Sequence, residues 1–536
     1  MKTIKKSVIL VISSIFAAVS FTACSADDGI VEQTPTFTNK NIEKPVSDAK
    51  VTASGIVRVE AKKNFARGNA DELKPEDFNI RQVSASEAET MLQDDGGKSS
   101  FSMYQWVTLN YLCNTADGTQ KELSELVVWP YRNYVVVETT PAANQLVIGC
   151  HSTITSDAQC PSNFSNMSSL GEINMLALFA NGWSQNALVV VPDYEGYGST
   201  ASIPHPYCNR ELTAEQVVTG VKAGLSYYEN NVSKMAPDWS GVAIGYSQGG
   251  AVAAGVLRYC QEHNETSLRL KGAVCGDGPY DPLATLKRYI EMDKLYMPVA
   301  PSLLLKGAVD TDPDMMALNC KYEDFVTDEF FQTGIFDLIR DKKATTDDIQ
   351  AALLKHSFEY GDEGGFTMRA LSNDGFLPYT KSNADSKGKK RTFELENGKG
   401  YNYCTVDQCL KPEVIEYFRN GTISGDVPEA KLKALENALA KNALTAGGFT
   451  PGKGFTFFHS IGDEVVPYCN FESVRNTWGV NSIEALSYQS STTLHVATGT
   501  AFFLSYCGNL VDEILKGEWA PREETVGGHF WARSCE

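Results

Sequence analysis

The sequence predicts an α/β fold: a mainly parallel central sheet flanked by helices, with a mostly helical cap inserted between two of its strands. Three observations favour this fold class. Short, continuously apolar runs recur along the chain, helix-like stretches separate them, and a long charged segment precedes the last of these runs. Strands that alternate with helices are typical of a parallel sheet covered on both faces.

The composition is that of a globular protein rather than a disordered or fibrous one. Hydrophobic residues make up 43% of the 536 residues and charged residues 21%. The formal net charge is −19, and a surface so negative repels phosphate backbones. We therefore expect no nucleic-acid partner.

Residues 1–23 are predicted to be a signal peptide. Their start is basic, and the apolar run over residues 8–19 is too short to span a bilayer. Small residues then precede Cys24 in an arrangement that resembles a bacterial lipobox. We expect Cys24 to be acylated and to anchor an outer-membrane lipoprotein through its lipid, with exposure at the cell surface as one option. The alternative is an ordinary secretory signal and a periplasmic or secreted protein.

The remaining cysteines can form disulfides in such an oxidising compartment, although the sequence does not give their pairing. Cys404 and Cys409 are close enough in sequence for a local bridge. No cysteine or histidine group has the spacing of a zinc site, and we predict no metal.

The first half of the mature chain divides into three parts. Residues 24–50 are predicted to be a flexible tether, and residues 51–100 are a polar N-terminal extension without an assigned structure. The first part of the core covers residues 101–280. It opens with two strand-like runs, near 107–112 and 126–129, that flank a turn at Asp117-Gly118.

Four apolar runs are then predicted to be parallel strands buried on both faces, with helices between them. The predicted strands are residues 145–150, 187–191, 241–246 and 270–275, and the predicted helices include residues 213–228 and 251–261.

Residues 281–450 are predicted to be a cap domain, and residues 451–536 complete the core from a strand at 454–458 onward. Because the insertion falls between two strands, we expect it to cover the carboxyl ends of the sheet, where α/β sites lie. The alternative is an independent helical domain that takes no part in the site.

The strongest chemical signal is Gly245-Tyr246-Ser247-Gln248-Gly249. A serine at the tip of a tight strand-to-helix turn needs small neighbours, because the two backbones nearly touch there. An apolar strand precedes this segment, and a helix with small first residues follows it. We therefore predict that Ser247 is a nucleophile.

A serine nucleophile needs a base and an orienting acid, which follow it in that chain order in folds with this turn: serine, acid, histidine. Asp463 lies in a loop that leaves an apolar strand and is the predicted acid. Asp277, after the strand that ends at residue 275, is the rival. Glu464 is adjacent to Asp463 but is expected to point elsewhere.

Two histidines follow Asp463. His495 lies between a strand-like run and an amphipathic helix, in a loop suited to a catalytic base. His529 lies near the C-terminus, beyond the point where the fold should be complete, and is the weaker candidate.

The tetrahedral intermediate of acyl transfer also needs two hydrogen-bond donors. We expect one from the backbone N–H of Gln248. The second should come from the loop His151-Ser152-Thr153, and the choice between Ser152 and Thr153 stays open. His151 is expected to shape this loop.

Four motifs in order resemble the secretory lipases, the lipase A-like α/β-hydrolases. They are His151-Ser152-Thr153 with Cys160-Pro161-Ser162, Pro192 to Gly198 followed by His205-Pro206-Tyr207, the Gly245 to Gly250 turn, and Gly462-Asp463-Glu464-Val465-Val466-Pro467-Tyr468. The similarity covers about residues 104–515 and leaves the cap unmatched.

The resemblance implies an α/β-hydrolase core, hydrolysis of carboxylic esters without a cofactor, and a triad of Ser247, Asp463 and His495. It also implies that Asp193 and Tyr194 are structural. Ser152 stands where the family has glycine, which puts the acyl preference in doubt.

The leading hypothesis is therefore a serine esterase or lipase that acts on a small-molecule, lipid or glycan ester. One alternative is an esterase of the same fold that removes acetyl or feruloyl groups from glycans. Another is a non-enzymatic surface binding protein on a hydrolase core. Neither the acyl chain length nor the oligomeric state follows from the sequence.

Overall fold

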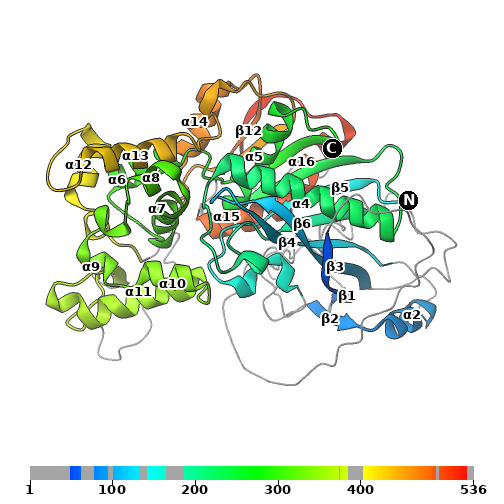
Figure 1. The fold of residues 1–536 in the computed structure, drawn as a ribbon, viewed down its shortest axis with the longest axis horizontal. Helices are drawn as coiled ribbons and strands as arrows, with labels where there is room; N and C mark the ends of the chain where they lie inside the picture. The colour runs from blue at the N-terminus through cyan, green and yellow to red at the C-terminus, as the bar shows by residue number, and fades with distance from the viewer. Residues whose placement is uncertain are drawn as a thin grey trace.

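The computed structural model describes residues 49–61, 78–94, 101–131, 142–164, 186–372, 375–383, 402–489 and 494–527. The predicted signal peptide, the lipidation site Cys24, nearly all of the predicted tether and His529 lie outside these residues. Figure 1 shows a large twisted sheet with helices packed against it and a separate group of helices to one side.

The core is a sheet of eleven described strands in the order β13-β12-β11-β8-β7-β5-β6-β4-β3-β1-β2. The seven strands from β13 to β6 are parallel, and those from β4 onward are antiparallel. The parallel strands are β5 (Gln145–Cys150), β6 (Ala187–Pro192), β7 (Ser240–Tyr246), β8 (Leu270–Gly276), β11 (Phe455–Ser460), β12 (Glu484–Tyr488) and β13 (Arg522–Val526). The predicted mainly parallel α/β sheet is confirmed.

Helices cover both faces of this sheet. Successive side chains of a strand point to opposite faces, and here the side chains on both faces are apolar and need a covering layer. In β5, Leu146 and Ile148 pack toward α4 and α5, whereas Val147 packs toward the C-terminal helices. The core helices are α4 (Arg210–Asn231), α5 (Gln248–Glu262), α14 (Cys469–Trp478), α15 (His495–Ala501) and α16 (Cys507–Lys516). None of the described helices is long and apolar enough to cross a membrane.

The segment predicted as a polar N-terminal extension contributes to the sheet. Its elements are β1 (Lys50–Ala61), β2 (Phe78–Val83) and α2 (Ala85–Asp94), and they precede β3 (Phe101–Asn114) and β4 (Gln120–Pro130). β1 pairs with β3 over most of its length. At the other edge, β13 pairs with β12 and lies within residues 451–536, which were predicted to complete the core.

The cap lies between β8 and β11 and has its own hydrophobic core. In Figure 1 its helices form the group beside the sheet. They are α6 (Pro282–Met292), α7 (Val299–Thr311), α8 (Pro313–Ala317), α9 (Asp328–Phe331), α10 (Ile335–Asp341), α11 (Thr346–Tyr360), α12 (Pro412–Asn420) and α13 (Glu429–Ala440), with a hairpin of β9 (Arg369–Ser372) and β10 (Gly375–Pro378). Cys404 Sγ and Cys409 Sγ lie 3.3 Å apart here, at hydrogen-bonding distance, and no disulfide joins them.

Candidate active site

Ser247 occupies the sharp turn between β7 and α5. Its φ of 56° and ψ of −128° lie in a region that side-chain-bearing residues rarely adopt. A Cβ on Gly245 would lie 2.1 Å from the carbonyl oxygen of Gly249, and one on Gly249 would lie 2.0 Å from that of Cys150. The two glycines are therefore required for the strand, the turn and the helix to approach so closely.

Three residues predicted from the sequence form one hydrogen-bonded row. Ser247 Oγ lies 2.9 Å from His495 Nε2, and His495 Nδ1 lies 2.6 Å from Asp463 Oδ2. Ser247 directly follows β7, Asp463 lies in the loop after β11, and His495 begins α15. All three side chains are buried. Asp463 can only accept when ionised, so Nδ1 carries the ring proton and Nε2 faces the serine hydroxyl.

The loop after β11 fixes the Asp463 carboxyl. Its Oδ1 accepts hydrogen bonds from the backbone N–H groups of Val465 (2.9 Å) and Val466 (2.7 Å). Burial raises the pKa of Asp463, and the hydrogen bonds from the backbone N–H groups of Val466 and Val465 oppose that rise. Oδ1 therefore bonds the backbone of its own loop, and Oδ2 accepts from His495 Nδ1.

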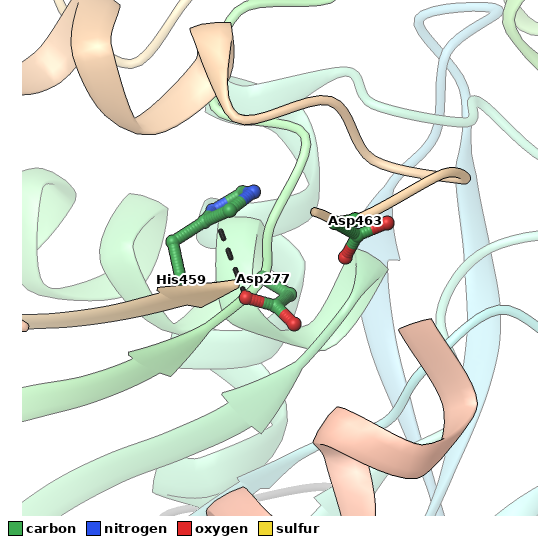
Figure 2. Close-up of side chains that lie close together, drawn as sticks. All are labelled: Asp277, His459 and Asp463. Carbon is green, nitrogen blue, oxygen red and sulfur yellow. Dashed lines mark ion pairs between the residues drawn. The ribbon is translucent and has the colours of Figure 1, made fainter. Parts of the chain in front are cut away.

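Asp277, the rival acid, lies beside Asp463, and it is Asp463 that bonds His495 Nδ1. Figure 2 shows Asp277 at the end of β8, with His459 of β11 and Asp463 beside it. Asp277 Oδ1 accepts from the backbone N–H of Ser460 at 2.7 Å, and Oδ2 lies 2.5 Å from the Tyr246 hydroxyl. Asp277 is therefore a neighbour of the row and does not take the place of Asp463.

The same three residues are the one group among the described residues with the spacing of a metal site. One ligand atom of each of Asp277, His459 and Asp463 lies within 4.8 Å of the others. Every carboxylate oxygen of the two aspartates already has a hydrogen-bonding partner. A cation would have to displace those partners, so we assign no metal to the group.

The loop after β5, which carries the predicted oxyanion donors, is held by aromatic packing. His151 stacks on Tyr194 with ring centroids 3.8 Å apart, and its ring nitrogens face the carbonyl oxygens of Ser152 and Asp193. Burial lowers the pKa of His151 to about 4. These contacts favour the loop-shaping role predicted for His151.

The candidate donors differ in their surroundings. Thr153 Oγ1 hydrogen-bonds the Tyr207 hydroxyl at 2.9 Å, and Ser152 is half-buried beside it. Gln248 is the first residue of α5, where backbone N–H groups have no acceptor within the helix. The assignment of an oxyanion role to Gln248, Ser152 or Thr153 stays a prediction.

Asp193 and Tyr194 hold neighbouring loops, as expected of structural residues. Asp193 accepts from the Ser162 N–H at 2.8 Å and from the Ser124 hydroxyl at 2.6 Å. Burial raises the pKa of Asp193 to about 6. Tyr194 has a positive φ of 65° and stacks on His151.

Sequence reasoning missed three side chains near the row. His205 accepts a hydrogen bond from the Gln248 side chain at 2.8 Å and donates from Nδ1 to the Glu195 carbonyl at 2.7 Å. Tyr246 contacts the His495 carbonyl, and Glu464 accepts from the His495 backbone N–H. The motifs contain all three residues, but no local pattern specifies these contacts.

The chain is similar to known lipases and esterases in both sequence and fold. The family model described as secretory lipase matches residues 158–335, from the loop after β5 into the cap. No curated protein matches the sequence. Solved structures share the fold at low sequence identity.

The first such structure is the rice cell wall degrading esterase LipA from Xanthomonas oryzae, with 14% identity, 88% of this chain and 99% of that chain covered, and a TM-score of 0.54. A hydrolase described as putative from Legionella pneumophila shares 16% identity, with 82% and 96% covered and a TM-score of 0.53. Lipase A from Candida antarctica in its closed state shares 15%, with 79% and 81% covered and a TM-score of 0.50.

The fold is that of the α/β-hydrolases, as the sequence predicted. Fold and family match together define the chain as a carboxylic ester hydrolase of that superfamily. Within the superfamily it resembles the secretory lipases, which confirms the resemblance drawn from its four motifs.

Proposed function

We propose that the protein hydrolyses carboxylic esters through an acyl-enzyme, with Ser247 as the nucleophile, His495 as the general base and Asp463 as the orienting acid. The single observation that carries this proposal is the row of two hydrogen bonds, 2.9 Å and 2.6 Å long, that joins the three side chains. A nucleophile within reach of a base that a third group orients is the arrangement that activates a serine hydroxyl.

In the first half of the reaction, Ser247 Oγ forms a bond to the ester carbonyl carbon while His495 Nε2 takes the hydroxyl proton. The Gln248 N–H and a donor from Ser152 or Thr153 stabilise the oxyanion. The carbon–oxygen bond to the alcohol then breaks, and His495 gives its proton to the departing oxygen. A water molecule then attacks the acyl carbon while His495 Nε2 takes its proton. The bond between that carbon and Ser247 Oγ breaks, His495 returns the proton to Oγ, and the carboxylic acid leaves.

Asp463 keeps its negative charge throughout this sequence. It holds His495 with the proton on Nδ1 and stabilises the imidazolium that forms in each half-reaction. Since side chains and backbone amides supply every step, the proposal needs no cofactor.

The substrate has two candidate classes. The family match favours esters of the kind that lipases cleave. The likeness in fold to a rice cell wall degrading esterase favours a glycan-directed acyl esterase as the second candidate. The same row would serve both, so the substrate profile must separate them.

The test is turnover of p-nitrophenyl acetate, butyrate, octanoate and palmitate by the full chain beside Ser247→Ala. We expect the variant to lose at least about 10³-fold in kcat. Ser267→Ala, which changes an exposed serine, is the matched control. A preference for long acyl chains would favour a lipase. A preference for acetate together with release of acetate or ferulate from polysaccharide would favour the glycan esterase.

The acyl-enzyme has its own readout. A fluorophosphonate should add one adduct mass to the wild-type chain and none to Ser247→Ala. Labelling without turnover of any ester would keep the nucleophile and overturn the substrate class. Absence of both from folded protein would overturn the triad and leave the surface binding protein as the better hypothesis.

We further propose that lipid on Cys24 holds the protein at the outer membrane. The small residues before that cysteine support the proposal. Metabolic labelling with a fatty acid should mark the wild-type chain and not Cys24→Ser, with Cys113→Ser as the control. Equal labelling of the wild type and Cys24→Ser would contradict it.

A further inference from the structure

The Tyr246 hydroxyl lies between two oxygen atoms, and one of them belongs to the proposed base. Its oxygen is 2.6 Å from the backbone carbonyl of His495 and 2.5 Å from Asp277 Oδ2. Tyr246 directly precedes Ser247, so this hydroxyl connects the strand that carries the proposed nucleophile to the helix that carries the proposed base.

These two short contacts need two protons. A phenol has one proton, and the His495 carbonyl can only accept. If Tyr246 donates to the carbonyl, an ionised Asp277 would face the phenol oxygen with a lone pair at 2.5 Å. If Tyr246 donates to Asp277, the carbonyl would face it in the same way at 2.6 Å. A proton on Asp277 satisfies both contacts.

The second oxygen of Asp277 already has a donor. Oδ1 accepts from the Ser460 backbone N–H at 2.7 Å, so the carboxyl is complete when Oδ2 carries a proton.

The charges around Asp277 favour the same assignment. The titratable groups that face it are Tyr246 from β7, Tyr280 from the segment before α6, His459 from β11, Asp463 from the loop after β11, and His495 from α15. Burial has the largest effect and raises the pKa of Asp277, as does the Asp463 carboxylate, whereas positive charge on His459 or His495 and the Tyr246 hydroxyl lower it.

His459 does not supply that positive charge. Its Nε2 lies 2.9 Å from the Val466 carbonyl and must carry a proton to bond it. Its Nδ1 is buried, has no hydrogen-bond partner among the described residues, and is 3.9 Å from Asp277 Oδ1 (Figure 2). A second proton, on Nδ1, would have no acceptor within hydrogen-bonding distance among the described residues, and burial also lowers the pKa of His459, so we take the ring as neutral.

We propose that Asp277 is a positioning residue that works as a neutral carboxylic acid: its Oδ2–H donates to the Tyr246 oxygen, and Tyr246 donates to the His495 carbonyl. This inference deepens the proposed function, since it assumes that His495 is the base. Asp277 and Tyr246 touch no reacting atom. They fix the backbone of His495 at the start of α15, while Asp463 beside them orients the His495 ring.

Three variants test the activity side. Asp277→Ala removes the donor and should lower kcat about tenfold with little change in KM. Asp277→Asn keeps a donor toward Tyr246 and an acceptor for Ser460, and it should recover most of that loss. Tyr246→Phe keeps the ring packing and removes only the hydroxyl, and it should lower kcat about as much as Asp277→Ala.

Two further activity readouts separate positioning from charge. The Tyr246→Phe and Asp277→Ala losses should not add in the double variant, because both residues act through one chain of hydrogen bonds. The acid limb of the pH profile for kcat reports the protonation of His495, and a charge at position 277 would shift that limb. This limb should coincide in the wild type and Asp277→Asn, because on this proposal neither has such a charge. A shift of that limb to lower pH in Asp277→Asn, or a loss beyond tenfold, would mean that Asp277 is an anion and would overturn the proposal.

An infrared measurement does not depend on ester hydrolysis or on Asp277→Ala folding. At pH 7 the wild-type spectrum should contain a carbonyl stretch of an un-ionised carboxyl that Asp277→Asn lacks. Asp310→Asn is the control, because Lys306 and the Tyr322 hydroxyl both bond that carboxylate at 2.5 Å, and its spectrum should keep the band. No difference between the wild type and Asp277→Asn would overturn the neutral acid even if Ser247 proves to be the nucleophile. If Asp277→Asn lacks the band but the wild type hydrolyses no ester, the neutral acid stands and only the proposed function is refuted.

Discussion

The Glu464 carboxylate accepts a hydrogen bond from the backbone N–H of His495 at 3.0 Å. The preceding residue, Asp463, accepts from the ring of the same histidine at 2.6 Å. Two adjacent acids thus hold both the backbone and the ring of His495. Glu464 also lies at the N-terminus of α15, where a negative charge is favourable. Glu464 was expected to point elsewhere, but its carboxylate contacts the backbone of the histidine whose ring Asp463 contacts.

Glu464→Gln should weaken the pH dependence of stability. Burial and then the Asp463 charge raise the pKa of Glu464 to about 7, from an ordinary value of 4.5. A raised carboxyl pKa means that the folded state binds this proton more tightly than the unfolded chain does. The resulting stability is fully present below about pH 4.5 and is lost as the pH rises through about 7.

Urea unfolding at pH 4.5, 6 and 8 measures this effect. The wild type should lose up to about 3 kcal/mol more than Glu464→Gln between the lowest and the highest pH. Glu472→Gln, which changes an exposed glutamate of α14, should match the wild type. Parallel curves for all three proteins would contradict the raised pKa of Glu464.

The parts of the site that the sequence predicted are those that local pattern or chain order specifies. Ser247 follows from two glycines that must flank a tight turn after an apolar strand. Asp463 and His495 follow from the order in which triad residues occur in folds of this kind. Asp277 was recognised only as a rival acid. Its contacts join β7, β8 and β11, and those strands are adjacent only in the folded sheet.

The parts of the fold that the sequence missed are at the edges of the sheet. β13 is Arg522–Val526 and is almost entirely polar, so it lacks the apolar run that identified the central strands. Charged side chains are common on edge strands, where they oppose pairing with other chains. β1 also mixes polar and apolar residues and is recognisable as a strand only through its pairing with β3.

Gly249→Ala should prevent normal folding of the nucleophile turn. Its Cβ would lie 2.0 Å from the carbonyl oxygen of Cys150 and 2.7 Å from that of His151, and both are backbone atoms that cannot rotate away. We expect a loss of more than about 3 kcal/mol in the free energy of unfolding, or insoluble protein. Gly255→Ala, on the same helix with its nearest atom at 3.4 Å, is the control. Equal unfolding midpoints for the two variants would contradict this geometry.

Asp463→Asn should lower kcat by about 10³–10⁴-fold with little change in KM. The amide can no longer hold the His495 proton on Nδ1 or stabilise the imidazolium, while the N–H groups of Val465 and Val466 keep the loop in place. The comparison with Asp277→Asn decides between the two acids. If Asp277→Asn had the larger loss, the sequence-predicted acid would be wrong.

Lys342 joins the cap to the two loops that border the site. Its ammonium, just after α10, donates to the carbonyl oxygens of Gly196, Ala201 and Ile203, the second at 2.9 Å, and lies 5.4 Å from the centre of the Tyr197 ring. The Lys342 carbonyl accepts from the Asp157 N–H at 2.8 Å, in the loop that follows the predicted oxyanion donors.

Lys342→Met should therefore destabilise the protein and loosen the cap. The substitution keeps much of the aliphatic stem but removes the donor to one buried carbonyl oxygen, that of Gly196, and to two partly buried ones, those of Ala201 and Ile203. Leaving a buried acceptor without its donor costs about 1–3 kcal/mol. Thermal unfolding should give a lower midpoint, and hydrogen exchange should rise in the loop after β5 and around residues 196–203. Lys343→Met is the matched control, because that neighbouring side chain is exposed. If exchange rose equally in both variants, or only within the cap, Lys342 would not be the contact that joins the cap to the site loops.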